Sequence, residues 1–181
     1  ELTVDRPNSS RMGMALRRVI EPKLEQRQKE LSVKFDSHPI TVELSAGPRA
    51  SNVSGTLGGY GNLYSFIGFS EGQRPTDVIS RIFKEKIKFK VRRAGTTGKY
   101  KVTFYIPSAD EIYNLTPIPW MTGKSWAKSI EEGGLSNLGQ YLFSSTGFGN
   151  SRAGTGIQAK NKASGVTFSR MPYIGKLIKD F

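Results

Sequence analysis

The sequence contains no cysteine among its 181 residues. This absence excludes disulfide bonds, thiol nucleophiles and metal sites that use cysteine ligands. His38 is the only histidine, so a metal site built from several histidines is excluded as well. No run of about eighteen apolar residues occurs, and we therefore expect no segment that spans a bilayer. No apolar stretch follows Arg6-Pro7, so no signal peptide is expected either.

Acidic residues are scarce compared with basic ones. The chain has 15 Asp and Glu residues against 27 Lys and Arg residues, which gives a net charge of +12. A charge of this size favours association with nucleic acid, an acidic protein surface or an anionic membrane. Hydrophobic residues make up only 36% of the chain. We therefore expect one domain with a modest core and long surface segments.

No catalytic constellation is found in the sequence. Gly123-Lys124-Ser125 resembles the end of a phosphate-binding loop, but Ile118 stands where that motif needs a glycine. His38 precedes a proline in an expected turn, and no nucleophile-elbow motif accompanies it. The acidic pair Asp110-Glu111 is assigned to a helix cap, and Glu131-Glu132 to a solvated surface. We therefore expect neither an enzyme nor a bound cofactor or metal.

The clearest structural pattern lies between residues 84 and 106. Apolar and polar residues alternate in two runs that a Gly-rich turn separates, which predicts a β-hairpin. Its apolar face comprises Ile87, Phe89, Val91, Tyr100, Val102, Phe104 and Ile106. On its basic face, the candidate contacts to an anionic partner are Lys86, Lys88, Lys90, Arg92, Lys99 and Lys101. Either this face meets an acidic partner, or it is a solvated face whose lysines keep strand edges apart.

A helix is predicted to follow the first residues of the chain, and Ser9 or Ser10 is suited to cap it. The apolar residues at helical spacing are Met12, Leu16, Val19, Ile20, Leu24 and Leu31. Pro22 lies inside this pattern and should kink or divide the helix, because it removes a backbone donor and crowds the preceding turn. We expect this helix to dock on a sheet; binding at a membrane surface is the alternative.

Shorter elements are predicted along the rest of the chain. Apolar patterning predicts strands over residues 40–44 and 62–69, and a second hairpin over residues 157–168. Short helices are predicted after Pro75, after the capping box that begins at Ser108, and within residues 120–132. A final turn or two of helix is predicted within residues 172–181.

Together these elements predict an α+β fold. We expect an N-terminal helix packed on a small, mostly antiparallel sheet with the central basic hairpin, followed by short C-terminal helices and long Gly-rich loops. The chain is interpreted as a single domain, residues 1–181, with extended arms at about 45–61 and 143–156. A small core, long arms and strong charge are typical of a subunit whose segments order against its neighbours. An exposed sheet edge also suits strand addition from an adjacent copy.

Three stretches of the sequence resemble a known protein family. They are residues 61–69 (GNLYSFIGF), residues 117–126 (PIPWMTGKSW) with their continuation to residues 138–142 (LGQYL), and residues 151–158 (SRAGTGIQ). These stretches are similar to virion structural proteins of tailed bacteriophages, of the neck and tail-completion kind. The resemblance covers roughly the middle and C-terminal two-thirds of the chain.

The resemblance implies a small α+β protomer of a ring at the head–tail junction of a virion assembled in the host cytoplasm. Such rings stack on other neck, tail or portal proteins and surround a channel through which DNA passes. The family has no catalytic residues, so the resemblance implies no enzyme and assigns no binding residue.

Two functions are therefore left open. The first is a structural assembly protein that forms a homo-oligomeric ring and has no membrane partner. The second is a basic nucleic-acid-binding module that uses the hairpin lysines. Only Tyr105 among the hairpin aromatics lies on the basic side, which favours phosphate contact over base stacking. An enzyme that uses His38 comes third.

Overall fold

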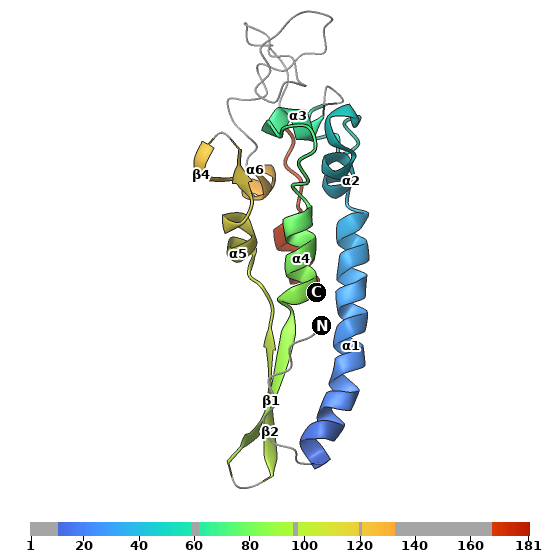
Figure 1. The fold of residues 1–181 in the computed structure, drawn as a ribbon, viewed down its shortest axis with the longest axis vertical. Helices are drawn as coiled ribbons and strands as arrows, with labels where there is room; N and C mark the ends of the chain where they lie inside the picture. Colours follow the sequence, from blue (N-terminus) through green and yellow to red (C-terminus); the bar gives the residue numbers. More distant parts are fainter. Residues whose placement is uncertain (1–10, 59–61, 96–97, 120, 133–167) are drawn as a thin grey trace, which may run out of the picture.

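The chain folds into an elongated molecule, with most helices gathered toward one end and a β-hairpin extending toward the other (Figure 1). Helix α1 (Arg11–Asp36) runs along one side, and the hairpin lies beside its N-terminal half. The computed structural model describes residues 11–58, 62–95, 98–119, 121–132 and 168–181.

Helix α1 is one continuous helix, so Pro22 does not divide it. Its buried residues are Gly13, Leu24, Leu31 and Phe35. The predicted apolar stripe is therefore confirmed only in part. Leu24 and Leu31 reach the core, whereas Met12 and Val19 are 59% and 57% exposed.

Helix α2 (Pro39–Ala46) occupies a segment for which a strand over residues 40–44 was predicted. That prediction was wrong. An alternating strand would bury Val42 and expose its neighbour, yet Val42 is exposed and Glu43 is fully buried. Short apolar runs fit both the helical and the strand period, and here the flanking residues decide between them.

The junction between α1 and α2 explains why a helix begins here. The backbone of His38 is extended, and its Nδ1 accepts a hydrogen bond from the N–H of Ile40 at 3.3 Å. Pro39 takes the first helical position, where a missing N–H costs nothing. Gly47 follows the helix with a positive φ of 74°, a conformation that favours glycine.

The loop after α2 folds back onto the chain around Glu43. Its carboxylate accepts hydrogen bonds from Nδ2 of Asn52 at 3.0 Å and from the N–H of Ser54 at 2.9 Å. It also accepts the N–H of Leu63 at 2.6 Å, the first residue of the next helix. Residues 47–58, which belong to the arm predicted at about 45–61, thus form a packed loop in this chain. Contact between this segment and a neighbouring copy stays a prediction.

Helix α3 (Leu63–Ile67) lies where a strand over residues 62–69 was predicted, and that prediction was also wrong. The side chain of Asn62 caps the helix by accepting the N–H of Ser65 at 2.8 Å. Gly68 ends it in the left-handed conformation, with φ of 90°. These two caps confine an apolar run of strand-like composition to one short, buried helix.

The predicted helix after Pro75 is confirmed as α4 (Asp77–Glu85), which packs beside α1. Gln28 of α1 joins the two helices, because its Nε2 donates to the carbonyls of Phe83 and Ile87 at 3.4 and 3.1 Å. These carbonyls lie at and just past the end of α4, where helical partners run out. Gln28 therefore fixes the start of the hairpin to α1.

The predicted hairpin is confirmed as β1 (Lys88–Ala94) and β2 (Lys99–Tyr105), which pair in antiparallel fashion. Phe89 lies opposite Phe104, and Val91 lies opposite Val102. The register thus gathers the predicted apolar residues on one face and Lys88, Lys90, Arg92, Lys99 and Lys101 on the other, whereas Arg93, opposite Tyr100, lies on the apolar face.

A second, smaller hairpin follows helix α5 (Ala109–Asn114). The predicted capping box is confirmed, since Ser108 and Glu111 each bind the other's backbone N–H. Strands β3 (Pro117–Ile118) and β4 (Met121–Ser125) then pair in antiparallel fashion. No strand was predicted at either position.

The two last described helices complete the core. Helix α6 (Trp126–Glu132) confirms the predicted helix, with Trp126 and Ile130 buried on one face. Helix α7 (Ile174–Lys179) confirms the predicted C-terminal helix and packs against α5, α6 and α1. The α+β class is thereby confirmed, with a long N-terminal helix, two small antiparallel strand pairs and short helices. Ser9, Ser10, the arm predicted at about 143–156 and residues 157–167 of the second predicted hairpin lie outside the described ranges.

Candidate functional site

The hairpin brings most of the predicted anion contacts together. Alternation and register place five of them on one face: Lys88, Lys90 and Arg92 of β1, and Lys99 and Lys101 of β2. Lys86 lies apart, because it caps the end of α4 before β1 begins. Arg92, Lys99 and Lys101 are exposed, and the others on this face are half-buried.

Like charges face each other directly across the hairpin. Arg92 is the cross-strand partner of Lys101, and Lys88 is the partner of Tyr105. The ammonium of Lys90 lies 5.4 Å from the centre of the Tyr105 ring, which is a cation–π distance. No acidic residue occurs between residues 86 and 106. The basic face therefore has no carboxylate of its own strands to neutralise it.

The apolar face of the hairpin is covered unevenly. On the β1 side, Ile87 is fully buried and Val91 nearly so, because this strand lies against α1. On the β2 side, Phe104 and Ile106 remain 50% and 47% exposed. Phe89 and Phe104 face each other across the strands as a tilted pair, with ring centres 6.3 Å apart. This side thus presents large apolar side chains that the described part of the chain leaves uncovered.

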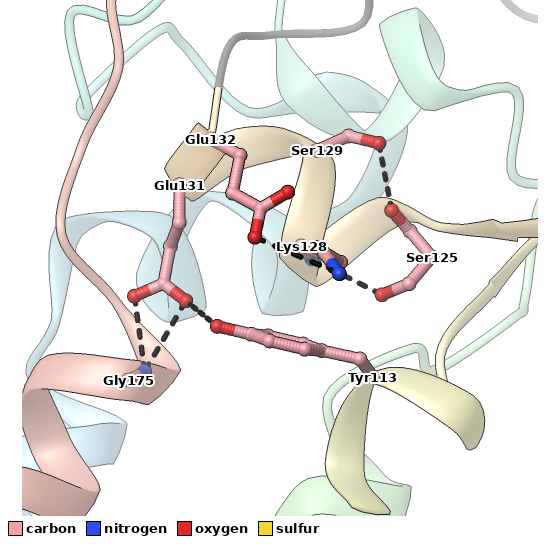
Figure 2. Close-up of polar contacts among 7 residues, drawn as sticks. All are labelled: Tyr113, Ser125, Lys128, Ser129, Glu131, Glu132 and Gly175. Atoms are coloured by element: carbon pink, nitrogen blue, oxygen red, sulfur yellow. Dashed lines mark hydrogen bonds and ion pairs between the residues drawn. The ribbon is translucent and has the colours of Figure 1, made fainter. Parts of the chain in front are cut away.

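Glu131 forms a second polar centre, which joins α5, α6 and the C-terminal segment (Figure 2). Its carboxylate accepts the N–H of Tyr173 at 2.6 Å, the N–H of Gly175 at 3.0 Å, and the hydroxyl of Tyr113. A side chain at Gly175 would begin 3.4 Å from both carboxylate oxygens, so glycine lets the acid approach closely. The prediction that Glu131 lies on a solvated surface was wrong.

Two hydrogen bonds of Ser125 define the start of α6. The hydroxyl of Ser125 accepts the N–H of Lys128 at 3.1 Å, and Ser129 donates its hydroxyl to the carbonyl of Ser125 at 2.8 Å (Figure 2). Glu132 pairs with Lys128 at 3.6 Å on the exposed side of the helix, as the prediction for a solvated surface requires. Glu131 lies one helical turn after Ala127, which is buried, so Glu131 faces the core side of α6.

Two tyrosines near Glu131 are held in their protonated form. Burial raises the pKa of Tyr173, whose hydroxyl is paired with Oγ1 of Thr41 at 2.8 Å. Burial also raises the pKa of Tyr113, and the hydrogen bond to the Glu131 carboxylate raises it further. A phenol with a raised pKa is a poor nucleophile and a poor base at neutral pH. The centre is therefore suited to holding α7 in place.

His38 has a structural position. Its Nδ1 accepts the N–H of Ile40, and its Nε2 lies 3.1 Å from the carbonyl of Pro172. Since a carbonyl only accepts, Nε2 carries the hydrogen and the ring is neutral. Burial lowers the pKa of His38, in agreement with a neutral ring. The ring thus ties the junction of α1 and α2 to the C-terminal segment.

Within the described ranges, no group of His, Asp and Glu side chains is arranged to hold a metal ion. None of the helices in that part of the chain is both long and apolar enough to cross a membrane. Comparison of the chain with protein-family models, curated proteins and solved structures finds no match.

Proposed function

We propose that this chain is a virion structural protein of a tailed bacteriophage, a ring-forming subunit of the neck or tail-completion kind that joins head and tail around the DNA channel. The proposal rests on the three stretches of sequence that resemble this family, together with the surface chemistry of the hairpin. The proposed partners are further copies of the chain and other neck, tail or portal proteins, in a virion assembled in the host cytoplasm. The role requires no catalytic residue and no cofactor.

The observation that most supports a contact role is the open part of the hairpin's apolar face. Phe104 and Ile106 are each about half exposed, although both extend a sheet face whose β1 side is buried. Large apolar side chains gathered on an exposed surface mark interaction sites in soluble proteins. Burying them against a neighbouring copy would stabilise an oligomer at about 25 cal/mol per Å² of apolar surface removed from water.

Helix α1 adds a second exposed apolar surface in the same half of the molecule. Met12 and Val19 are separated by two helical turns and lie on one side of the helix. A hairpin surface that packs on a different surface of the next copy makes a head-to-tail contact, and such contacts close into a ring when the rotation permits. This geometry supports the ring form of the proposal.

Electron microscopy of the purified full chain tests the proposal. We expect closed rings of identical subunits, or rings that appear when the chain is mixed with the neck and tail proteins of its parent particle. A chain that stays monomeric alone and with those partners would refute the proposed assembly role. A further check is antibody labelling of the parent particle, which should mark the head–tail junction.

A further inference from the structure

The basic face of the hairpin concentrates positive charge on one surface, on which Arg92, Lys99 and Lys101 are exposed. The basic residues on this face are Lys88, Lys90, Arg92, Lys99 and Lys101, and no acidic residue occurs between residues 86 and 106. The ion pairs of Arg27 with Glu30 and of Lys128 with Glu132 belong to α1 and α6 and not to the hairpin. We propose that this face binds the phosphodiester backbone of nucleic acid.

The register of the strands makes this arrangement unfavourable for the hairpin alone. Arg92 and Lys101 lie directly opposite each other, and like charges in that position destabilise a strand pair. Lys99 adds a third cation two residues from Lys101 on the same face. A bound polyanion would turn this repulsion into attraction, because its phosphates would lie between and above the cations.

The spacing of the charges also fits a polymer with regular charges. Alternate residues of one strand are about 6.6 Å apart, so Lys88, Lys90 and Arg92 form an even row along β1. The exposed ring of Tyr105 lies within this face, next to the Lys90 ammonium. Proteins that bind single strands combine such a basic surface with aromatic rings on which bases stack. This ring is a feature that a merely solvated lysine face does not need.

The placement of apolar residues disfavours a membrane as the partner. Proteins that lie on a membrane insert apolar side chains while flanking cations meet the lipid headgroups. Here Phe104 and Ile106 belong to the opposite face of the hairpin from Arg92, Lys99 and Lys101. One flat surface cannot meet both sets at once, whereas a nucleic acid strand needs only the basic face.

Fluorescence anisotropy with a labelled DNA duplex and a labelled single strand tests the inference. The full chain is compared with the triple variant Lys88→Gln, Arg92→Gln and Lys101→Gln across about 50 to 200 mM salt, the range in which phosphate contacts lose most affinity. The control variant is Lys29→Gln, Lys34→Gln and Lys124→Gln, which removes the same charge from exposed residues outside the hairpin.

We expect the hairpin variant to lower the slope of log affinity against log salt by about 2.7 for duplex DNA, since each phosphate contact contributes about 0.9. The control variant should leave the slope within experimental error. Tyr105→Ser should weaken single-strand binding about tenfold, and Tyr105→Phe should preserve it. Undetectable binding at low salt, or equal losses in both triple variants, would overturn the inference.

Phosphatidylserine vesicles provide the competing partner. Binding to vesicles without binding to DNA would also overturn the inference. The inference does not depend on the proposed ring, and light scattering on the same samples separates the two. A ring without affinity for DNA removes the inference alone, whereas a monomer that binds DNA removes the assembly role alone. If circular dichroism shows that the triple variant is unfolded, Arg92→Glu is used instead. This substitution should weaken DNA binding more than Arg92→Gln does.

Discussion

The helical end and the hairpin end of the molecule satisfy their charged groups in different ways. At the helical end, Glu43 and Glu131 each accept several hydrogen bonds from backbone N–H groups and neighbouring side chains. At the hairpin end, cations lie side by side with no carboxylate on either strand. The carboxylates of Glu43 and Glu131 thus hold segments of the helical end together. The exposed cations of the hairpin have no carboxylate on their own strands.

This difference teaches which end is scaffold and which end is surface. Removing such a carboxylate would leave several backbone N–H groups of the core without a hydrogen-bond acceptor. Like charges that face each other across a strand pair destabilise it, so the pairing of Arg92 with Lys101 favours a role outside the fold. The helical end is therefore the support in our proposal, in which the hairpin is the part that contacts partners.

Glu43→Ala should cause the largest change at the helical end. It leaves the buried N–H groups of Ser54 and Leu63 without their acceptor, and we expect the free energy of unfolding to fall by about 4 kcal/mol. Urea denaturation followed by circular dichroism measures this loss. The exposed Glu132→Ala is the control and should change stability by less than about 0.5 kcal/mol. Equal effects of the two substitutions would show that Glu43 does not anchor the loop.

Glu131→Ala should have the next largest effect. We expect the free energy of unfolding to fall by about 2 to 3 kcal/mol, because the acid is half-buried and accepts the N–H groups of Tyr173 and Gly175. Hydrogen exchange should show that the substitution speeds the exchange of amide hydrogens in α7 more than in α4. Tyr113→Phe removes only the hydroxyl contact and should cost about 1 kcal/mol. Unchanged exchange in α7 would contradict the role assigned to Glu131.

Lowering the pH below about 6.5 should weaken the helical end through His38. Burial lowers the pKa of His38, so the unfolded chain takes up this proton before the folded chain does. The stabilisation is complete above the unfolded pKa and is lost as the pH falls through the folded pKa. Thermal melts between about pH 7 and 5 should show this loss. The variant His38→Asn keeps a capping acceptor but does not titrate, and it should flatten the pH dependence.

Arg92→Glu should produce the smallest change, and in the opposite direction. It replaces a like pair with an opposite pair facing Lys101, and we expect a gain in stability of about 0.2 to 1 kcal/mol. Lys99→Glu makes the same change in charge opposite Ala94 and should gain less. Differential scanning calorimetry measures both. A loss of stability in Arg92→Glu would mean that the cations already help to hold the hairpin.

The sequence predicted the hairpin and the capped helices because their signals are local. The alternation through Val91 and Val102 and the capping box at Ser108 need no knowledge of distant contacts. The segments around Val42 and Phe66 were misread as strands, because each has only a few apolar residues and its caps decide the outcome. Glu131 was placed on the surface because its partners at Tyr173 and Gly175 are more than forty residues away. Alternation predicted five of the six residues assigned to the basic face, whereas Lys86 belongs to the end of α4, and the opposition of Arg92 and Lys101 required the register.

Size-exclusion chromatography with light scattering tests the central claim, that the hairpin end is built for contact, most directly. The variant Phe104→Ser with Ile106→Ser is compared with the full chain and with the control Val33→Ser with Val42→Ser, which changes exposed valines on α1 and α2. We predict that the full chain and the control form the same oligomer and that the hairpin variant is a folded monomer. A full chain that is monomeric at every concentration, or an oligomer that the hairpin variant leaves intact, would contradict the claim.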